Sequence, residues 1–176
     1  YTGEKGLEIY VPADAAKKVW DALMEAGEAD GLRPAGLGAR DTLRLESGFC
    51  LYGNDLSDET TPLEAGLGWV TKLDKGDFVG REPLQKQKAG GVPRKLIGFV
   101  MQERRIPRHG DGLAADETGE RIGEVTSGSQ SPSLNRGIGL GYVPNDPAYT
   151  TPGTTLYLDQ RGKRFTAIVQ KPPFGG

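Results

Sequence analysis

The sequence lacks the residues from which several kinds of site are built. Of its 176 residues, one is a cysteine (Cys50) and one is a histidine (His109). A single cysteine excludes an internal disulfide framework and any cluster of cysteine metal ligands. A single histidine excludes the zinc motifs that need two. Any chemistry must therefore come from carboxylates, arginines and aromatic side chains, and we expect no metal site.

The sequence also has no marked excess of either charge and no long apolar run. Lysine and arginine together number 22 and aspartate and glutamate 24, so the formal net charge is −2. A domain that binds nucleic acid electrostatically has a basic excess instead, so we expect no nucleic-acid partner. No run of 18 apolar residues occurs, so we expect no membrane-spanning helix.

Both common nucleotide-binding motifs are incomplete. Gly36-Leu37-Gly38 begins like a dinucleotide fingerprint, but Asp41 stands where the third glycine belongs. Gly162-Lys163 is followed by Arg164, whereas a phosphate-binding loop requires serine or threonine at that place. These departures argue against both nucleotide-binding folds.

The first 90 residues mix strand and helix patterns. The alternation over residues 7–11 predicts a strand that has Glu8 and Tyr10 on the face opposite its apolar side chains. Asp14 can cap a following helix whose apolar stripe would pack on a sheet and which ends near Gly27. Further helices are expected from about Gly38 to Gly48 and over 81–88, with a short strand over 69–73 between them.

Beyond Ala89–Pro93 the pattern changes to alternation only. Turn signals separate five strand candidates, which are Lys95–Gln102, Arg121–Ser127, Gly137–Val143, Thr154–Asp159 and Arg164–Gln170. Several short strands without a helical pattern indicate a small β-barrel or sandwich. We therefore predict an α+β chain with a helix-and-strand domain over residues 1–90 and an all-β domain over 93–176.

Three side chains are candidates for ligand binding, and each has a purely structural alternative. Glu8 is either a solvated edge-strand glutamate or a carboxylate that accepts two parallel N–H bonds from a planar ligand. Arg40 either pairs with the adjacent Asp41 or holds a ligand carboxylate, which matches the guanidinium fork. Trp69 is either a core residue or a flat wall for an aromatic ligand. Composition and spacing leave these alternatives open.

Several blocks of the sequence resemble the second half of the glycine cleavage system T-protein family, the aminomethyltransferases. They follow the family order across nearly the whole chain and comprise residues 1–8, 38–46, 50–55, 61–69, 75–82, 123–128 and 131–134. Asp77 stands where the related iron–sulfur-assembly and tRNA-linked folate proteins carry a cysteine, which argues against that branch. Because Tyr1 is not a methionine and no signal-peptide pattern follows it, we expect a fragment of a longer protein.

The resemblance implies a three-domain arrangement around a central tetrahydrofolate site. Its middle domain, here truncated at its N-terminus, would be a ferredoxin-like antiparallel sheet with helices, and its last domain a small β-barrel. Glu8 and Arg40 would contact the folate and Trp69 would line its pocket. The family's key aspartate belongs to the first domain, so we expect no catalytic residue within these 176 residues and no activity from the fragment alone.

The implied reaction transfers the methylene carbon of a lipoyl-bound aminomethyl group to the cosubstrate tetrahydrofolate and releases ammonia. The partner would be the lipoylated H protein, in the bacterial cytoplasm or, for a eukaryotic protein, the mitochondrial matrix. Two alternatives stay open. One is the folate-binding module of a dimethylglycine or sarcosine dehydrogenase, and the other is a folate-binding scaffold without transferase activity.

Overall fold

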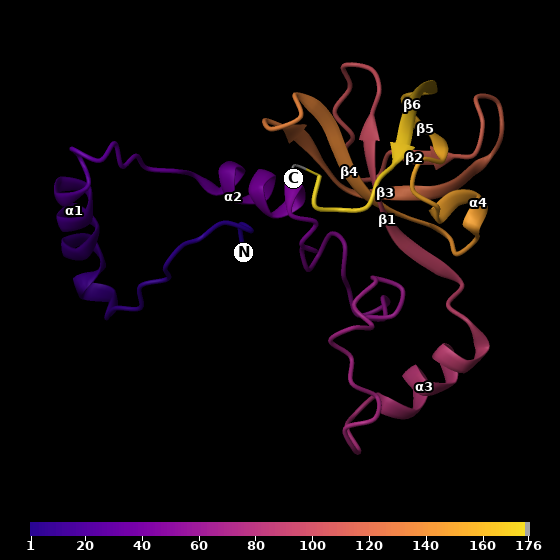
Figure 1. Ribbon diagram of the computed structural model, residues 1–176, viewed down its shortest axis with the longest axis horizontal. Helices are drawn as coiled ribbons and strands as arrows, with labels where there is room; N and C mark the ends of the chain where they lie inside the picture. The colour runs from indigo at the N-terminus through magenta and orange to yellow at the C-terminus, as the bar shows by residue number, and fades with distance from the viewer. Residues whose placement is uncertain (175–176) are drawn as a thin grey trace.

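The last part of the chain forms a closed antiparallel barrel. The structure, a computed structural model, describes residues 1–174. Going round the barrel, the strands lie in the order β1-β4-β3-β2-β5-β6, and β6 pairs with β1 to close it (Figure 1). Their bounds are β1 Arg94–Met101, β2 Gly112–Ala114, β3 Arg121–Ser131, β4 Arg136–Pro144, β5 Thr155–Gln160 and β6 Lys163–Val169. The predicted small β-barrel is confirmed.

Strand alternation divides the apolar side chains of the barrel between its inside and its outside. On β1, Phe99 belongs to the inner core and Val100 to a second cluster. Because successive side chains point to opposite faces of a strand, the two clusters lie on either side of the barrel wall. On β4, Gly139 leaves room for the Phe99 ring, since a Cβ atom there would stand 2.4 Å from the ring's Cζ atom.

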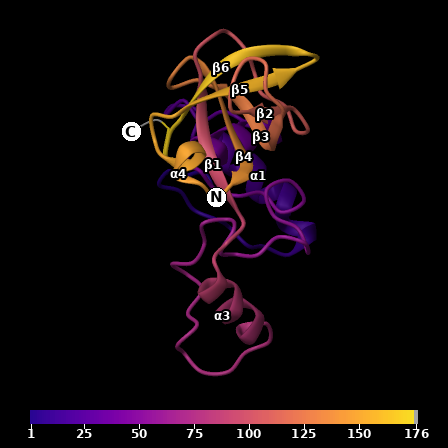
Figure 2. The same ribbon diagram turned by 90° about the vertical axis from the view of Figure 1, so that its right-hand side faces the viewer.

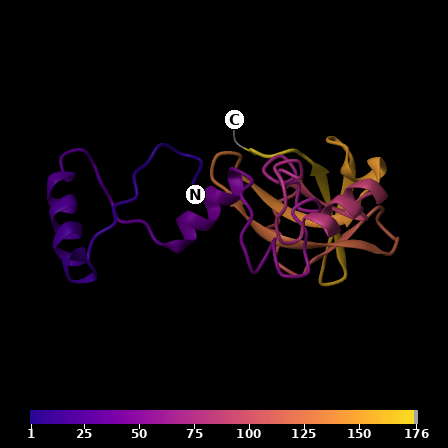
Figure 3. The ribbon, with the colours of Figure 1, turned by 90° about the horizontal axis from the view of Figure 1, so that it is seen from below.

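The outer cluster attaches the first part of the chain to the barrel. Leu45, which is fully buried, packs with Ile138 and Leu140 of β4 and with Phe174. Leu45 lies in helix α2, Leu37–Glu46, and in Figures 1 and 3 the C-terminal end of this helix lies beside the barrel. The barrel therefore has a helix fixed to its outer surface.

Three other helices and a 3₁₀ turn complete the described chain. Turn η1, Ala13–Ala15, precedes α1, Ala16–Ala26, at the end of two extended segments far from the barrel (Figure 1). Helix α3, Arg81–Gly90, projects below the barrel (Figure 2), and the short α4, Pro147–Thr150, follows β4. No helix among residues 1–174 is long and apolar enough to cross a bilayer.

The predicted helices are confirmed, as are the glycines expected at the C-terminal ends of the first two. Gly27 is the C-cap of α1. Gly48, just beyond the C-cap of α2, has φ +75°, a left-handed conformation that glycine adopts without strain. Asp14 is an exception, because it lies inside η1 and no side-chain bond caps that turn or α1. The prediction that Asp14 caps the first helix was therefore wrong.

The two strands predicted in the first part are absent. Residues 7–11 are extended but pair with no other described segment, and Leu7 is 93% exposed. Residues 69–73 form turns in which local acceptors bind the backbone N–H groups, such as Leu67 O, which accepts from Val70 N. A strand needs a partner for its backbone groups, and alternation alone supplies none.

The predicted ferredoxin-like sheet over residues 1–90 is consequently not confirmed. An isolated bridge between Tyr52 and Leu56 is the sole β-pairing among residues 1–93. The apolar stripe of α1 also lacks the sheet on which it was expected to pack, since Trp20 is 53% and Leu23 44% exposed. What the structure supports is the coarser arrangement, a closed barrel accompanied by helices.

Candidate functional site

One pocket, the α2 pocket, lies where the opening segment of the chain passes the start of α2. Its volume is about 650 Å³, and it is lined by residues 1–8 and 35–43 in part, among them Tyr1, Glu8 and Arg40. Two of the three side chains singled out in the sequence therefore line one cavity. Both are exposed, so a ligand in the pocket can reach them.

The Tyr1 ring, rather than a carboxylate, contacts the Arg40 guanidinium. Its Cζ atom lies 4.5 Å from the centroid of the Tyr1 ring, which is cation–π geometry. The Tyr1 hydroxyl donates to the Cys50 carbonyl at 2.5 Å, and its ring stacks on Phe49 with centroids 6.0 Å apart. Asp41, the alternative partner of Arg40, pairs with a different arginine. The interpretation of Arg40 as half of a local ion pair with Asp41 was therefore wrong.

Glu8 has one hydrogen-bond partner among the described residues. The Tyr10 hydroxyl donates to Glu8 Oε2 at 2.6 Å, and this bond raises the pKa of Tyr10. The two side chains thus share a face, as their i, i+2 spacing predicted, although the strand is not formed. Tyr10 is thus the hydrogen-bond partner of the candidate carboxylate.

Trp69 lies apart from this pocket. It is 73% exposed and is not among the residues that line the cavity. Its interpretation as a core residue was therefore wrong. Its role at a folate site stays a prediction, as do the roles of Glu8 and Arg40.

A buried ion pair on the helix that carries Arg40 was not predicted from the sequence. Arg44 of α2 is 1% exposed and Asp55 is fully buried, and Arg44 Nη1 lies 2.8 Å from Asp55 Oδ2. Arg44 also donates to Asp41, to the Phe49 carbonyl and to Ser127 of β3. Burial opposes the charge of Arg44, but the bonds to Asp41 and the charge of Asp55 together raise its pKa.

The network continues from Asp55 into the barrel. Asp55 Oδ2 accepts from Leu51 N at 2.8 Å and from Ser127 Oγ at 2.9 Å, and Oδ1 accepts from the Thr126 hydroxyl. Adjacent residues of β3 reach the same carboxylate because the register of β3 against β4 shifts between Val125 and Ser127. The Arg44–Asp55 pair therefore ties the helix that carries Arg40 to the wall of the barrel.

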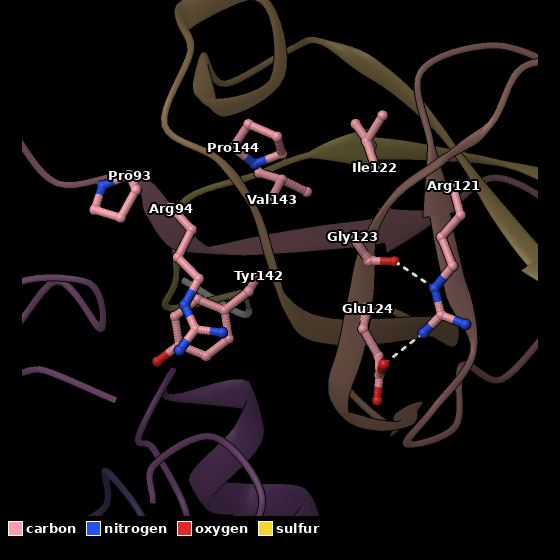
Figure 4. Close-up of a pocket in the computed structure, with 9 residues that line it drawn as sticks. All are labelled: Pro93, Arg94, Arg121, Ile122, Gly123, Glu124, Tyr142, Val143 and Pro144. Atoms are coloured by element: carbon pink, nitrogen blue, oxygen red, sulfur yellow. Dashed lines mark hydrogen bonds and ion pairs between the residues drawn. The ribbon is translucent and has the colours of Figure 1, made fainter. Parts of the chain in front are cut away.

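A second hollow of about 470 Å³ lies at the edge of the barrel (Figure 4). The Arg94 guanidinium stands over the Tyr142 ring, 4.8 Å from its centroid, and also binds Glu64 at 2.8 Å. Arg121 donates to the Gly123 carbonyl and to Glu124, as the dashed lines in Figure 4 mark. The charged groups of this hollow are thus already paired within the protein, and we assign it no ligand.

Two further observations bear on the chemistry of the described residues. Burial raises the pKa of the half-buried Cys50 thiol to about 11, so at neutral pH it is protonated and a poor nucleophile. Within residues 1–174, no group of three or more His, Cys, Asp or Glu side chains is placed to hold a metal ion. The candidate site is the pocket that Glu8 and Arg40 line.

These features place the chain among α+β proteins whose barrel carries a docked helical segment. Comparison with known families is more specific. The profile described as the GCVT N-terminal domain matches residues 1–75, and that of the glycine cleavage T-protein C-terminal barrel domain matches residues 94–175. The chain belongs to the glycine cleavage T-protein family, as its resemblance indicated.

Individual relatives support this assignment. The chain is 57% identical over 175 residues to an aminomethyltransferase of Bacteroides thetaiotaomicron and 55% identical over 174 residues to one of Halothermothrix orenii. Each alignment covers 99% of this chain and 48% of the relative. The crystal structure of glycine cleavage system aminomethyltransferase T from Bartonella henselae matches with a TM-score of 0.84 and 35% identity, over 93% of this chain and 45% of that one. The chain thus spans about half the length of the relatives it matches.

Proposed function

We propose that this chain is the C-terminal half of a tetrahydrofolate-dependent aminomethyltransferase of the glycine cleavage system. The observation that carries the proposal is its 57% identity, over nearly all its length, to a protein named aminomethyltransferase. In the proposed reaction, the methylene carbon exchanges its bonds to the lipoyl sulfur and the amino nitrogen for two bonds to folate nitrogens. Ammonia leaves, the sulfur gains a proton, and no oxidant is needed.

The residues of the α2 pocket suit such a cosubstrate. A pterin presents a planar edge of N–H donors, and the Glu8 carboxylate has two oxygens that accept such bonds. The glutamyl tail of folate carries carboxylates, which match the guanidinium of Arg40. Glu8 and Arg40 line the same pocket, which supports this assignment. Trp69 does not line this pocket, so it would have to contact a part of the ligand that extends beyond it.

The remaining features of the whole protein belong to the same proposal. Residues 1–90 would be part of a ferredoxin-like middle domain whose sheet forms in the longer protein, and residues 93–176 would be the barrel domain. The lipoyl group would be presented by the H protein. A cytoplasmic location is proposed because the relatives named above are bacterial.

A transfer assay on the intact protein tests the proposal. Supplied with aminomethylated lipoyl carrier protein and tetrahydrofolate, the protein is expected to release ammonia in proportion to the methylenetetrahydrofolate formed. Both products are measured in the same time course. An intact protein that binds tetrahydrofolate yet releases no ammonia would be the scaffold considered from the sequence, and the transferase proposal would be wrong.

The 176-residue chain assayed alone is expected to show no turnover. The family resemblance assigns the key aspartate to the first domain, and the chain spans only about half the length of its relatives. Ammonia release is measured with the chain and the intact protein at equal concentration. Turnover by the isolated chain would show that the catalytic group lies within these residues.

A further inference from the structure

Three serines of β3 form a row that faces helix α2. Ser127, Ser129 and Ser131 alternate along the strand, so their side chains share one face. Each makes a hydrogen bond to a different residue of α2. The Arg44 guanidinium donates to Ser127 Oγ at 2.8 Å, and Ser131 Oγ donates to Glu46. The third bond joins Ser129 Oγ and Thr42 Oγ1, which lie 3.2 Å apart.

The Thr42–Ser129 contact marks the point where α2 leaves the barrel. Every residue from Leu37 to Asp41 is exposed, whereas Thr42 to Glu46 are half-buried or buried. The N-cap of the helix, Gly36, makes no side-chain capping bond. The first turn of α2 therefore has neither a cap nor contact with the barrel, and such helix ends fray. Of the three serine contacts, the one at Thr42 lies nearest to this free end.

Arg40 lies in that free end, two residues before Thr42. Its guanidinium stands over the Tyr1 ring, and both line the α2 pocket. The cation–π contact fixes the Arg40 guanidinium against the Tyr1 ring, whereas the hydrogen bonds of α2 to β3 fix the helix from which the Arg40 side chain extends. The place of Arg40 in the pocket consequently depends on where α2 is anchored.

We propose that Ser129 is a positioning residue for the α2 pocket, acting through Thr42 to fix the point from which the Arg40-bearing end of α2 projects. This inference rests on the proposed folate function. It gives the barrel a role in ligand binding although no barrel strand lines the pocket. The ligand whose binding it governs is tetrahydrofolate, through the interaction that Arg40 makes with it.

The test compares variants of the intact protein, with tetrahydrofolate itself as the probe and calorimetry as the measurement. Ser129→Ala and Thr42→Val each remove one hydroxyl of the pair, and each is expected to raise the Kd for tetrahydrofolate about fivefold, the factor that follows if the whole net value of this one bond holds Arg40 in its binding position. The double variant should be no weaker than either single one, because both break the same bond. Thr42→Ser keeps the hydroxyl and should restore the Kd to within about twofold.

Ser133→Ala is the matched control. Ser133 Oγ bonds Glu46 at 3.2 Å, the same length as the Thr42–Ser129 contact, but at the other end of α2. Its loss should leave the Kd within about twofold of the unmodified protein. An equal rise in Kd for Ser133→Ala and Ser129→Ala would show a general loosening of the helix, and the positioning role would be wrong.

Arg40→Ala separates this inference from the proposed function. If Arg40 binds the folate, its removal should raise the Kd at least about tenfold, and Ser129→Ala should then cause no further rise. A further fivefold rise in the Arg40→Ala background would mean that Ser129 does not act through Arg40. An effect of Arg40→Ala alone, without any of Ser129→Ala, overturns the positioning role and leaves the folate site standing. An unchanged Kd for Arg40→Ala removes Arg40 from the folate site and overturns the positioning role with it, whereas the transferase proposal stands or falls on the ammonia assay.

Discussion

Asp55→Ala is expected to lower the free energy of unfolding of the chain by about 3–5 kcal/mol, the usual cost of breaking a buried ion pair from one side. The variant leaves Arg44, which is 1% exposed, without its fully buried counterion. It also removes the acceptor of Leu51 N, Thr126 and Ser127, and buried donors without acceptors are costly. Urea unfolding followed by far-UV circular dichroism measures the change.

Asp41→Ala is the matched control because it removes the other carboxylate that binds the same arginine. Asp41 Oδ1 lies 2.7 Å from Arg44 Nη2, but the Asp41 side chain is 49% exposed, so water screens the pair. We expect a loss of about 1 kcal/mol or less. A loss for Asp55→Ala no larger than that for Asp41→Ala would mean that burial of the pair does not determine how firmly α2 is held, contrary to our interpretation.

The parts of the fold that the sequence could predict are those that depend on local patterns. Local patterns were sufficient for the helices and for five of the barrel strands, since alternation and turn residues act over a few positions. β2, only three residues long, has too short a pattern to detect, and the four-residue α4 lies between two predicted strands, where no helix was expected. The strand predicted at 7–11 failed because pairing depends on a partner that alternation does not reveal.

The same distinction holds for the candidate site. The family resemblance selected Glu8 and Arg40, and the structure places both on one cavity. The contacts that support Arg40 and its helix join residues far apart in the sequence, such as Arg40 with Tyr1 and Thr42 with Ser129, the latter 87 positions apart. No local rule pairs such residues. The sequence could therefore nominate the groups proposed to face a ligand, but not the distant residues that hold Arg40 and its helix in place.

Glu8→Gln in the intact protein is expected to weaken tetrahydrofolate binding by about 1.5–3 kcal/mol, the value of hydrogen bonds to a charged group, which is about 10- to 150-fold in Kd. The carboxylate can accept two bonds from the N–H edge of a pterin. The amide keeps the shape but accepts with one atom and turns an N–H donor toward the donors of the ligand. Calorimetric titration with tetrahydrofolate measures the difference directly.

The geometry around Glu8 makes this test specific to the pocket. Its Oε2 already accepts from the exposed Tyr10 hydroxyl, and bonds of this kind exchange readily with solvent, so a ligand edge can take both carboxylate oxygens.

Glu25→Gln makes the same chemical change on α1, outside the lining of the pocket, and should alter the Kd by less than about twofold. Equal effects of the two variants would reflect net charge alone. A Glu8→Gln protein with affinity within about twofold of the unmodified one would exclude Glu8 from the folate site, and the planar edge of the ligand would have to be recognised elsewhere.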